Sequence, residues 1–508
     1  MVDKRVIKNA AFLYIRMLLL ILITLFTTKL LLKYLGIIDF GIYSLVWGVV
    51  LILGFFNNSI TNSVQRFLNI NLANKKNKKL IEIYSVSIVV FLVLGLFLAL
   101  ILIAFKDVFF FKFLNIPNDR VNIVNHIYYL MVGSFFINFL SLNFHSCLIS
   151  MEKFSFYAFI TVFEGILKLF SVFLLYYFPN KLYHYSLFLL ISSTIIFIVL
   201  FLYCKFKISF CRFSLVKNLN SYKEILGFIS WNVFGSFGVV ISAQGIPLVA
   251  NIFYGVIING SLSIASQLNA LIGTVTSNFQ KAFSPYLMKN FVSNDNVDIK
   301  IFNLTKLSIL FYSMVALPLI FYIHDLLLLW LNKIPLYVEG IVKISAIISL
   351  FEVLAGPLWM LIQAEGNIRK YQLCVFFVMI FSIPIAYILL YLNFNIYNVW
   401  FMLLFMNFIL LFLRIYFVNK IIGSNFFVNY FKTVLIPTFI FLGMGALLFF
   451  GITTLNMNQN LLILIILNAF GVFFLIVLAY FLLLDKHQKE NVYQLIRKIE
   501  DKVKGKIL

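Results

Sequence analysis

The chain has 508 residues, of which 63% are hydrophobic, 18% aromatic and only 11% charged. Soluble domains are about half apolar and about a quarter charged, so this composition excludes a soluble enzyme, a disordered chain and a secreted disulfide scaffold. Lys and Arg outnumber Asp and Glu by 40 to 18, which gives a formal net charge of +22. We therefore expect an all-α polytopic membrane protein whose few charges are mostly cations.

Continuous apolar runs recur along the whole sequence. A helix needs about 20 apolar residues to cross roughly 30 Å of hydrocarbon, and these runs lack the alternation typical of membrane β-strands. The first run is longer than that of a signal peptide, and no cleavage site follows it. The sequence predicts fourteen transmembrane helices, at residues 10–32, 41–61, 81–105, 125–149, 154–178, 182–204, 225–245, 257–280, 303–324, 341–363, 371–391, 396–418, 433–452 and 461–484.

The loops between these runs differ strongly in their cations. If the N-terminus is cytoplasmic, most Lys and Arg fall in cytoplasmic loops, as in the Lys-rich stretch 75–79. The positive-inside rule then places both termini in the cytoplasm. These cations also contact anionic membrane lipids, so the positive charge does not imply nucleic-acid binding. Residues 485–508 carry apolar side chains at helical spacing between cations, which predicts an amphipathic helix on the cytoplasmic leaflet; a frayed, solvated tail is the alternative.

Two segments indicate an internal repeat. Residues 33–45 (KYLGIIDFGIYSL) align without a gap with residues 252–264 (IFYGVIINGSLSI) at an offset of 219. Six predicted spans separate the copies, so both halves have one orientation, as in the parallel repeats of transporters. The alignment pairs Gly36 with Gly255, Ile38 with Ile257, Gly41 with Gly260 and Ser44 with Ser263. The predicted parts are an N-lobe at 1–204 (spans 1–6), a cytoplasmic linker at 205–224, a C-lobe at 225–418 (spans 7–12), spans 13–14 at 419–484 and the tail at 485–508.

Three motifs carry a family resemblance: YLGIIDFGIYSLVWG at the first repeat, QRFLN at the inner end of span 2, and SIASQLNALIGTVTSNFQKAFSPYL in span 8. Together they resemble the Wzx-type polysaccharide flippases of the multidrug/oligosaccharidyl-lipid/polysaccharide exporter superfamily. The resemblance implies two six-helix lobes around a V-shaped cavity. It also implies translocation of undecaprenyl-diphosphate-linked oligosaccharide repeat units from the cytoplasmic to the outer leaflet.

Charges within the predicted spans are the first candidates for a functional site, because a charge in hydrocarbon is expensive. Arg16 and Lys29 lie in span 1. They line the cavity and bind a diphosphate in one interpretation, for which the fork of Arg16 is well suited. In the other, their long side chains reach the interface and only anchor the helix.

Three further charges lie near the middle of spans. Glu164 and Lys168 in span 5 are four residues apart, which places them on one helix face as an ion pair. The pair is either structural, or Lys168 binds substrate while Glu164 releases it or takes up a proton. Glu352 in span 10 has no cation within a helical turn. It suits a coupling site for H⁺ or Na⁺, or else a carboxyl group hydrogen-bonded to a neighbouring helix.

The remaining candidates lie at span ends. Arg66 closes span 2 among polar residues, where it receives the lipid diphosphate or anchors the helix; Arg414 is expected to anchor span 12. The resemblance assigns Asp39 a gating or structural role, although the second repeat has Ile258 there. The histidines share no ligand spacing, and the cysteines Cys147, Cys204, Cys211 and Cys374 are expected to be small buried hydrophobic residues.

Three functions remain open from the sequence. The first is the flippase. The second is an ion-coupled multidrug/cation antiporter of the same superfamily, which would favour acidic residues where span 1 offers Arg16 and Lys29. The third is a membrane polysaccharide polymerase or glycosyltransferase. Such an enzyme would be expected to have a substantial outer loop with catalytic residues, whereas the longest outer loops here, 106–124 and 325–340, are short. No P-loop, nucleophile elbow or HExxH motif is present, so no enzymatic activity is expected.

The flippase hypothesis implies partners and a location. The substrate would be an undecaprenyl-diphosphate oligosaccharide for O-antigen or capsule, and the protein partners a polysaccharide polymerase and a chain-length regulator. The abundance of Lys, Asn, Ile and Phe is typical of an AT-rich bacterial genome, which favours the bacterial inner membrane. The sequence implies no metal and no cofactor, and leaves H⁺ or Na⁺ coupling open.

Overall fold

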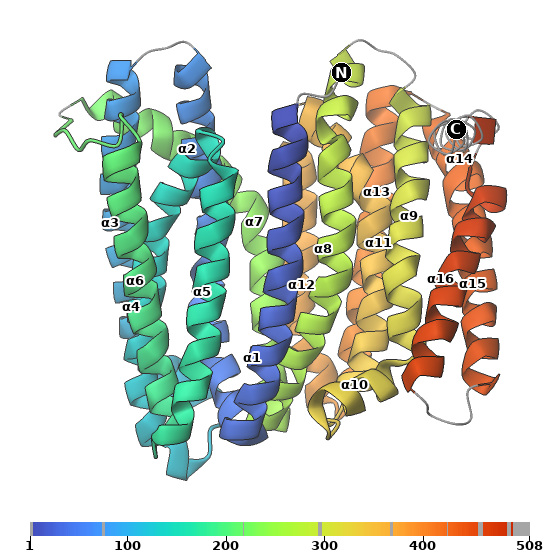
Figure 1. The fold of residues 1–508 in the computed structure, drawn as a ribbon, viewed down its shortest axis with the longest axis horizontal. Helices are drawn as coiled ribbons and strands as arrows, with labels where there is room; N and C mark the ends of the chain where they lie inside the picture. The colour runs from blue at the N-terminus through green and yellow to red at the C-terminus, as the bar shows by residue number, and fades with distance from the viewer. Residues whose placement is uncertain are drawn as a thin grey trace, which may run out of the picture. The chain divides into compact units, whose positions relative to one another are not determined.

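The computed structural model is helical throughout its described part, which comprises residues 4–73, 77–216, 218–292, 297–365, 369–423, 425–455, 461–484 and 489–490 (Figure 1). The predicted amphipathic tail at 485–508 lies almost wholly outside these residues. The α-helices are α1 (Lys4–Leu51), α2 (Phe55–Ala73), α3 (Asn77–Asp107), α4 (Val121–Ser150), α5 (Phe154–Leu174), α6 (Lys181–Lys207), α7 (Leu219–Tyr254), α8 (Val256–Val292), α9 (Val297–Phe321), α10 (Ile323–Leu331), α11 (Val338–Glu365), α12 (Arg369–Tyr391), α13 (Ile396–Ile422), α14 (Phe426–Tyr430), α15 (Ile436–Leu455) and α16 (Leu461–Leu482).

Twelve helices of the described chain are long and apolar enough to cross a membrane, and Ile466–Leu482 is a shorter apolar helix. The first of the twelve, Ile15–Asn57, has 43 residues. At 1.5 Å per residue it would be roughly 65 Å long, about twice the hydrocarbon thickness. It covers most of the predicted spans 10–32 and 41–61, which the non-helical residue Gly36 separates. Every predicted span therefore overlaps an observed apolar helix, and the all-α multi-pass fold is confirmed.

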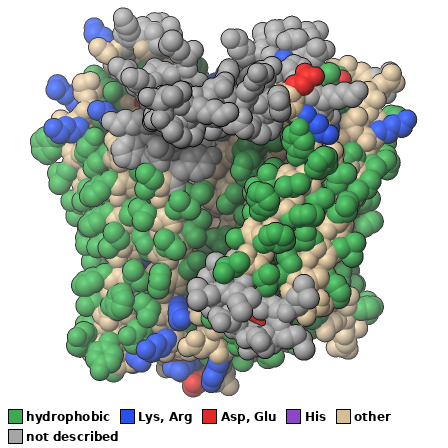
Figure 2. Space-filling view, turned by 45° about the vertical axis from the view of Figure 1, so that its right-hand side comes forward, with side chains coloured by type: hydrophobic (Ala, Val, Ile, Leu, Met, Phe, Trp, Pro, Cys, Tyr) green, Lys and Arg blue, Asp and Glu red, His purple; other side chains and the backbone are tan. Residues whose placement is uncertain are grey.

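The surfaces of these helices match a lipid environment. Large apolar side chains such as Leu100, Phe405 and Leu447 are 63%, 61% and 72% exposed. On the face drawn in Figure 2, hydrophobic side chains cover the middle of the helices and Lys and Arg gather toward the ends. Because lipid tails are themselves apolar, such exposure is stable in a membrane and not in water.

The chain divides into two compact units. Unit 1 comprises Met1–Ile264, Pro335–Tyr337 and Gln372–Val399. Unit 2 comprises Ala265–Ile334, Val338–Tyr371 and Trp400–Leu508. The lobe boundaries expected from the sequence stay a prediction.

Two glycines aligned by the internal repeat have the same unusual backbone conformation. Gly36, inside α1, has φ 74° and ψ 173°, and Gly255, between α7 and α8, has φ 70° and ψ −168°. This region of backbone space is essentially restricted to glycine. Both glycines therefore let one long apolar segment break sharply into two helices, which supports the repeat inferred from the sequence.

A second pair of aligned glycines lies where the two repeats touch within unit 1. A Cβ atom at Gly41 would collide with the carbonyl oxygen of Val256. A Cβ atom at Gly260 would lie 2.9 Å from Ile37 Cδ1 and 3.2 Å from the Ile37 carbonyl oxygen. Ile37 and Val256 are themselves related by the offset of 219. Gly41 of the first repeat thus packs against Val256 of the second, and Gly260 of the second packs against Ile37 of the first. The two repeats make the same contact in both directions.

This reciprocal contact predicts a stability effect. Gly41→Ala or Gly260→Ala should lower the free energy of unfolding by roughly 1–3 kcal/mol, because the added methyl group overpacks a backbone contact. Gly273→Ala in α8 is the matched control, since nothing lies within 4 Å of its Cβ position; alanine there should be neutral or slightly stabilising. Thermal unfolding of the purified protein in detergent measures the difference, and equal effects at all three positions would contradict the contact.

Candidate functional site

Helix α5 carries a tyrosine, an acid and a base on one face of a largely apolar span. Tyr157, Glu164 and Lys168 are spaced by seven and four residues, which are close to two turns and one turn of an α-helix. They therefore form a row along α5, and each of them contacts or approaches another polar group of unit 1. The three residues, together with Arg16 and His145, are called the α5 cluster below.

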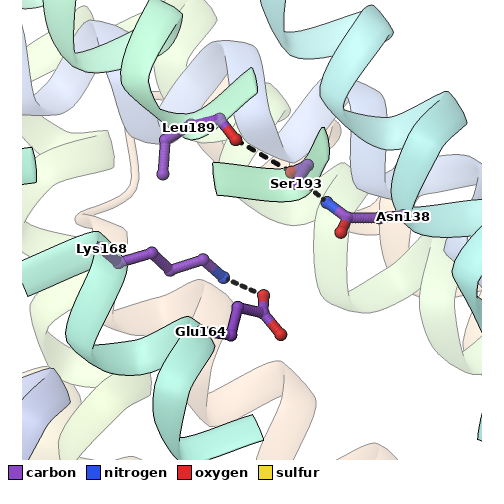
Figure 3. Close-up of polar contacts among 5 residues, drawn as sticks. All are labelled: Asn138, Glu164, Lys168, Leu189 and Ser193. Atoms are coloured by element: carbon purple, nitrogen blue, oxygen red, sulfur yellow. Dashed lines mark hydrogen bonds and ion pairs between the residues drawn. The ribbon is translucent and has the colours of Figure 1, made fainter. Parts of the chain in front are cut away.

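Glu164 and Lys168 form the ion pair that their spacing predicts. Lys168 Nζ donates to Glu164 Oε1 over 2.7 Å (Figure 3). The Lys168 side chain is 40% exposed and that of Glu164 is 26% exposed, so the pair borders an open surface. The prediction of a paired acid and base on α5 is confirmed, and each charge compensates the other at the depth of the span.

Arg16 from α1 and His145 from α4 converge on the ring of Tyr157. The Arg16 Cζ atom lies 4.9 Å from the ring centroid, which is a cation–π distance. The His145 ring stands perpendicular to the Tyr157 ring, with the centroids 5.4 Å apart. Arg16 Nε and His145 Nδ1 are buried and have no hydrogen-bond partner among the described residues. Two buried nitrogens without a hydrogen-bond partner among the described residues thus flank one aromatic ring.

Electrostatic contacts connect the parts of the α5 cluster. The charged groups of Glu164 and Arg16 both interact electrostatically with the His145 ring. At the other end of the row, Lys168 acts on Tyr43 in α1, whose ring packs edge-on against Tyr185 in α6 with centroids 5.1 Å apart. Polar groups therefore follow α5 from Tyr157 to Lys168, a distance of roughly 16 Å along the helix axis.

A neutral polar contact joins the two helices next to α5. Asn138 Nδ2 in α4 donates to Ser193 Oγ in α6 over 3.0 Å, and Ser193 Oγ donates to the Leu189 carbonyl over 2.9 Å (Figure 3). This contact ties α4 to α6. It involves none of the charged residues of α5.

The other sequence candidates lie elsewhere. Asp39 Oδ1 forms an ion pair with Arg120 Nε over 3.3 Å, at the connection that precedes α4. Lys29 is half-buried on α1, and Arg66 is exposed near the end of α2. Among the predicted residues, the structure thus brings Arg16, Glu164 and Lys168 into one cluster.

Glu352 belongs to unit 2 and is less isolated than its own helix suggests. The side chain is exposed on α11, and the charge of Arg414 on α13 acts on it. Arg414, expected only to anchor its helix, also donates from Nε to the Tyr371 hydroxyl over 2.6 Å. The ring of Tyr371 in turn lies 5.0 Å from that of Trp359. A carboxyl group, a guanidinium group and two aromatic rings therefore gather in unit 2.

Sequence reasoning missed Tyr157 and His145. The seven-residue spacing from Tyr157 to Glu164 was a usable signal, because it places both on one face of α5. His145 gave no such signal, since its partner is on another helix. Cys147, Cys204 and Cys211 are buried as expected, and Cys374 is half-buried. Within the described residues, no group of three or more His, Cys, Asp or Glu could hold a metal ion.

Comparison with known proteins gives a consistent fold. No protein-family model and no curated protein matches the sequence. The structure is similar to that of the lipid II flippase MurJ in an inward closed conformation, with a TM-score of 0.69 and 15% identity over 92% of this chain and 98% of that one. It is also similar to an inward-facing multidrug resistance MATE transporter of the MOP superfamily, with a TM-score of 0.65 and 12% identity over 79% and 94%.

The chain has the MOP-superfamily fold. A third similar structure, the MATE multidrug transporter DinF-BH in complex with a small molecule, has a TM-score of 0.63 and 13% identity over 84% of this chain and 97% of that one. By name, the first of the three is a lipid II flippase and the other two are multidrug transporters. The MOP fold therefore agrees with the superfamily that the motifs indicate. At 12–15% identity, a shared fold identifies neither the substrate of this chain nor a Wzx-type flippase.

The Glu164–Lys168 pair predicts a stability pattern. Lys168→Met alone leaves a carboxylate without its cation and should destabilise the protein by roughly 1–2 kcal/mol, less than the ~3–5 kcal/mol of a fully buried pair because Lys168 is 40% exposed. The double variant Glu164→Leu/Lys168→Met should be closer to wild type, because no charge is left behind. Thermal unfolding of both variants tests this, and a double variant less stable than the single one would contradict it.

Proposed function

We propose that the chain is a flippase that moves undecaprenyl-diphosphate-linked oligosaccharide repeat units from the cytoplasmic to the outer leaflet for surface polysaccharide synthesis. In this proposal it lies in the bacterial inner membrane with both termini in the cytoplasm. The observation that carries the proposal is Arg16: a guanidinium group in the first apolar helix, backed by an aromatic ring, whose buried Nε has no hydrogen-bond partner among the described residues.

The chemistry of Arg16 fits a diphosphate. A guanidinium group stays charged and binds two phosphate oxygens at once, whereas an ammonium group acts as a point charge. The α5 cluster holds two permanent cations, Arg16 and Lys168, against one carboxylate, Glu164. An anionic headgroup is therefore favoured over a cationic compound in unit 1.

Lys168 is proposed as a second binding site for the same headgroup. It lies three turns beyond Tyr157 on the same face of α5 and is already paired with Glu164 over 2.7 Å. A phosphate that reaches Lys168 must compete with Glu164, so binding there is reversible. Lys29 and Arg66 are proposed as further cations on the headgroup path, and Asp39 as a gate or structural residue through its pair with Arg120.

A second candidate function is ion-coupled export of cationic drugs. One observation favours it: Glu352 presents an exposed carboxyl group in unit 2, and acids attract cationic substrates. Arg414 weakens this argument, because its charge acts on the same carboxyl group. In the flippase proposal Glu352 instead serves as the coupling site for H⁺ or Na⁺.

The first functional prediction concerns Arg16. In proteoliposomes with a fluorescent undecaprenyl-diphosphate oligosaccharide, Arg16→Ala should lower the rate at which the label reaches the opposite leaflet by on the order of ten- to a hundredfold, the value of a lost charge-assisted hydrogen bond. Lys205→Ala is the matched control, since Lys205 also lies over aromatic rings but is exposed in the last turn of α6. Normal flipping by Arg16→Ala would remove Arg16 from the site. Wild-type protein that fails to flip the lipid but transports a fluorescent cationic dye would favour the antiporter.

The second functional prediction concerns coupling through Glu352. Glu352→Gln keeps the shape of the side chain but neither binds a proton nor carries a charge. Flipping rates measured across a series of pH and Na⁺ gradients should therefore lose their dependence on one of the two ions. A profile identical to that of wild type would assign Glu352 a structural role beside Arg414.

A further inference from the structure

Tyr157 is the point where three helices of unit 1 meet through polar side chains. It receives Arg16 from α1 at 4.9 Å and His145 from α4 at 5.4 Å, and it stands on α5 itself. The packing of α1 on α5 sets this geometry. A Cβ atom at Gly165 would lie 3.2 Å from Leu20 Cδ2 and 3.4 Å from Ile23 Cγ2, so the glycine allows α1 to approach closely. Arg16 lies one turn before Leu20.

An arginine at this position has a competing arrangement. Its long side chain could extend toward the membrane surface and leave the interior of unit 1. The face of an aromatic ring attracts a guanidinium group, and more strongly where water is excluded. A contact with the ring face orients the guanidinium group without occupying its N–H groups in a hydrogen bond. The hydroxyl group of the tyrosine is not needed for that attraction.

We propose that Tyr157 is a positioning residue: its ring holds the Arg16 guanidinium group in place to receive an anionic phosphate group, and His145 supports the ring from α4. This inference rests on the proposed function for the identity of the transported lipid. The positioning of Arg16 toward a phosphate anion can be measured separately from transport.

The inference predicts which part of Tyr157 matters. Tyr157→Phe keeps the ring, so the KM for the fluorescent lipid-linked oligosaccharide should stay within about twofold of wild type. Tyr157→Leu removes the ring and should raise KM on the order of 3- to 30-fold, the range of a cation–π contact. Phe170→Leu is the matched control, because Phe170 is an aromatic residue of α5 that is 57% exposed. It should leave KM unchanged.

A double-mutant cycle tests whether Tyr157 acts through Arg16. In the Arg16→Ala background, Tyr157→Leu should cause no further increase in KM, because the group that the ring positions is gone. Equal effects of Tyr157→Leu in both backgrounds would overturn the inference. Arg16→Lys tests the same contact by changing the cation: the charge stays but the planar group is lost. Its KM should therefore rise as that of Tyr157→Leu does. If Tyr157→Leu does not fold, Arg16→Lys still tests the contact.

Binding of inorganic pyrophosphate separates this inference from the proposed function. Pyrophosphate should raise the Tm of purified wild-type protein and of Tyr157→Phe, and raise it less for Tyr157→Leu and Arg16→Ala. If pyrophosphate binding depends on both residues while the wild-type protein does not flip the lipid, the positioning stands and the flippase proposal fails. If Arg16→Ala impairs flipping and pyrophosphate binding but Tyr157→Leu impairs neither, the flippase proposal stands and the positioning role is overturned.

Discussion

A charged side chain within an apolar helix must find compensation inside the protein, and this constraint organises unit 1. The chain meets it in two ways on one helix. Lys168 is compensated by a carboxylate one turn away, whereas Arg16 is compensated by an aromatic ring that carries no net charge. The difference matters, because a carboxylate neutralises its partner and a ring does not. The cluster therefore keeps a cation that still attracts an anion.

The apolar framework makes this arrangement possible. Small residues let helices approach closely where lipid supplies no hydrophobic driving force between them. Gly165 brings α1 against α5 through Leu20 and Ile23, and the approach carries Arg16 to Tyr157. The site is thus a consequence of helix packing one turn away from it. Its polar members need no loop to hold them, which suits a position at membrane depth.

Much of the fold follows from local sequence, and only part of the site does. Continuous apolar runs suffice to predict the spans, because a membrane-crossing helix is defined by its own residues. Glu164 and Lys168 are likewise predictable, since four residues on one helix fix their relative position. Arg16 and Tyr157 are 141 residues apart, so their contact depends on how α1 packs on α5. Arg414 approaches Glu352 for the same kind of reason, and inspection of α11 alone leaves Glu352 without a cation.

The reciprocal glycine contact has a consequence for the origin of the chain. Gly41 meets Val256 and Gly260 meets Ile37, so each repeat offers its neighbour the same surface that it receives. Within an oligomer, such self-complementary surfaces characterise dimers with two-fold symmetry. A single ancestral repeat with this helix face would have been able to associate with a second copy of itself. Gene duplication and fusion would then have made permanent a pairing that the shorter protein already formed.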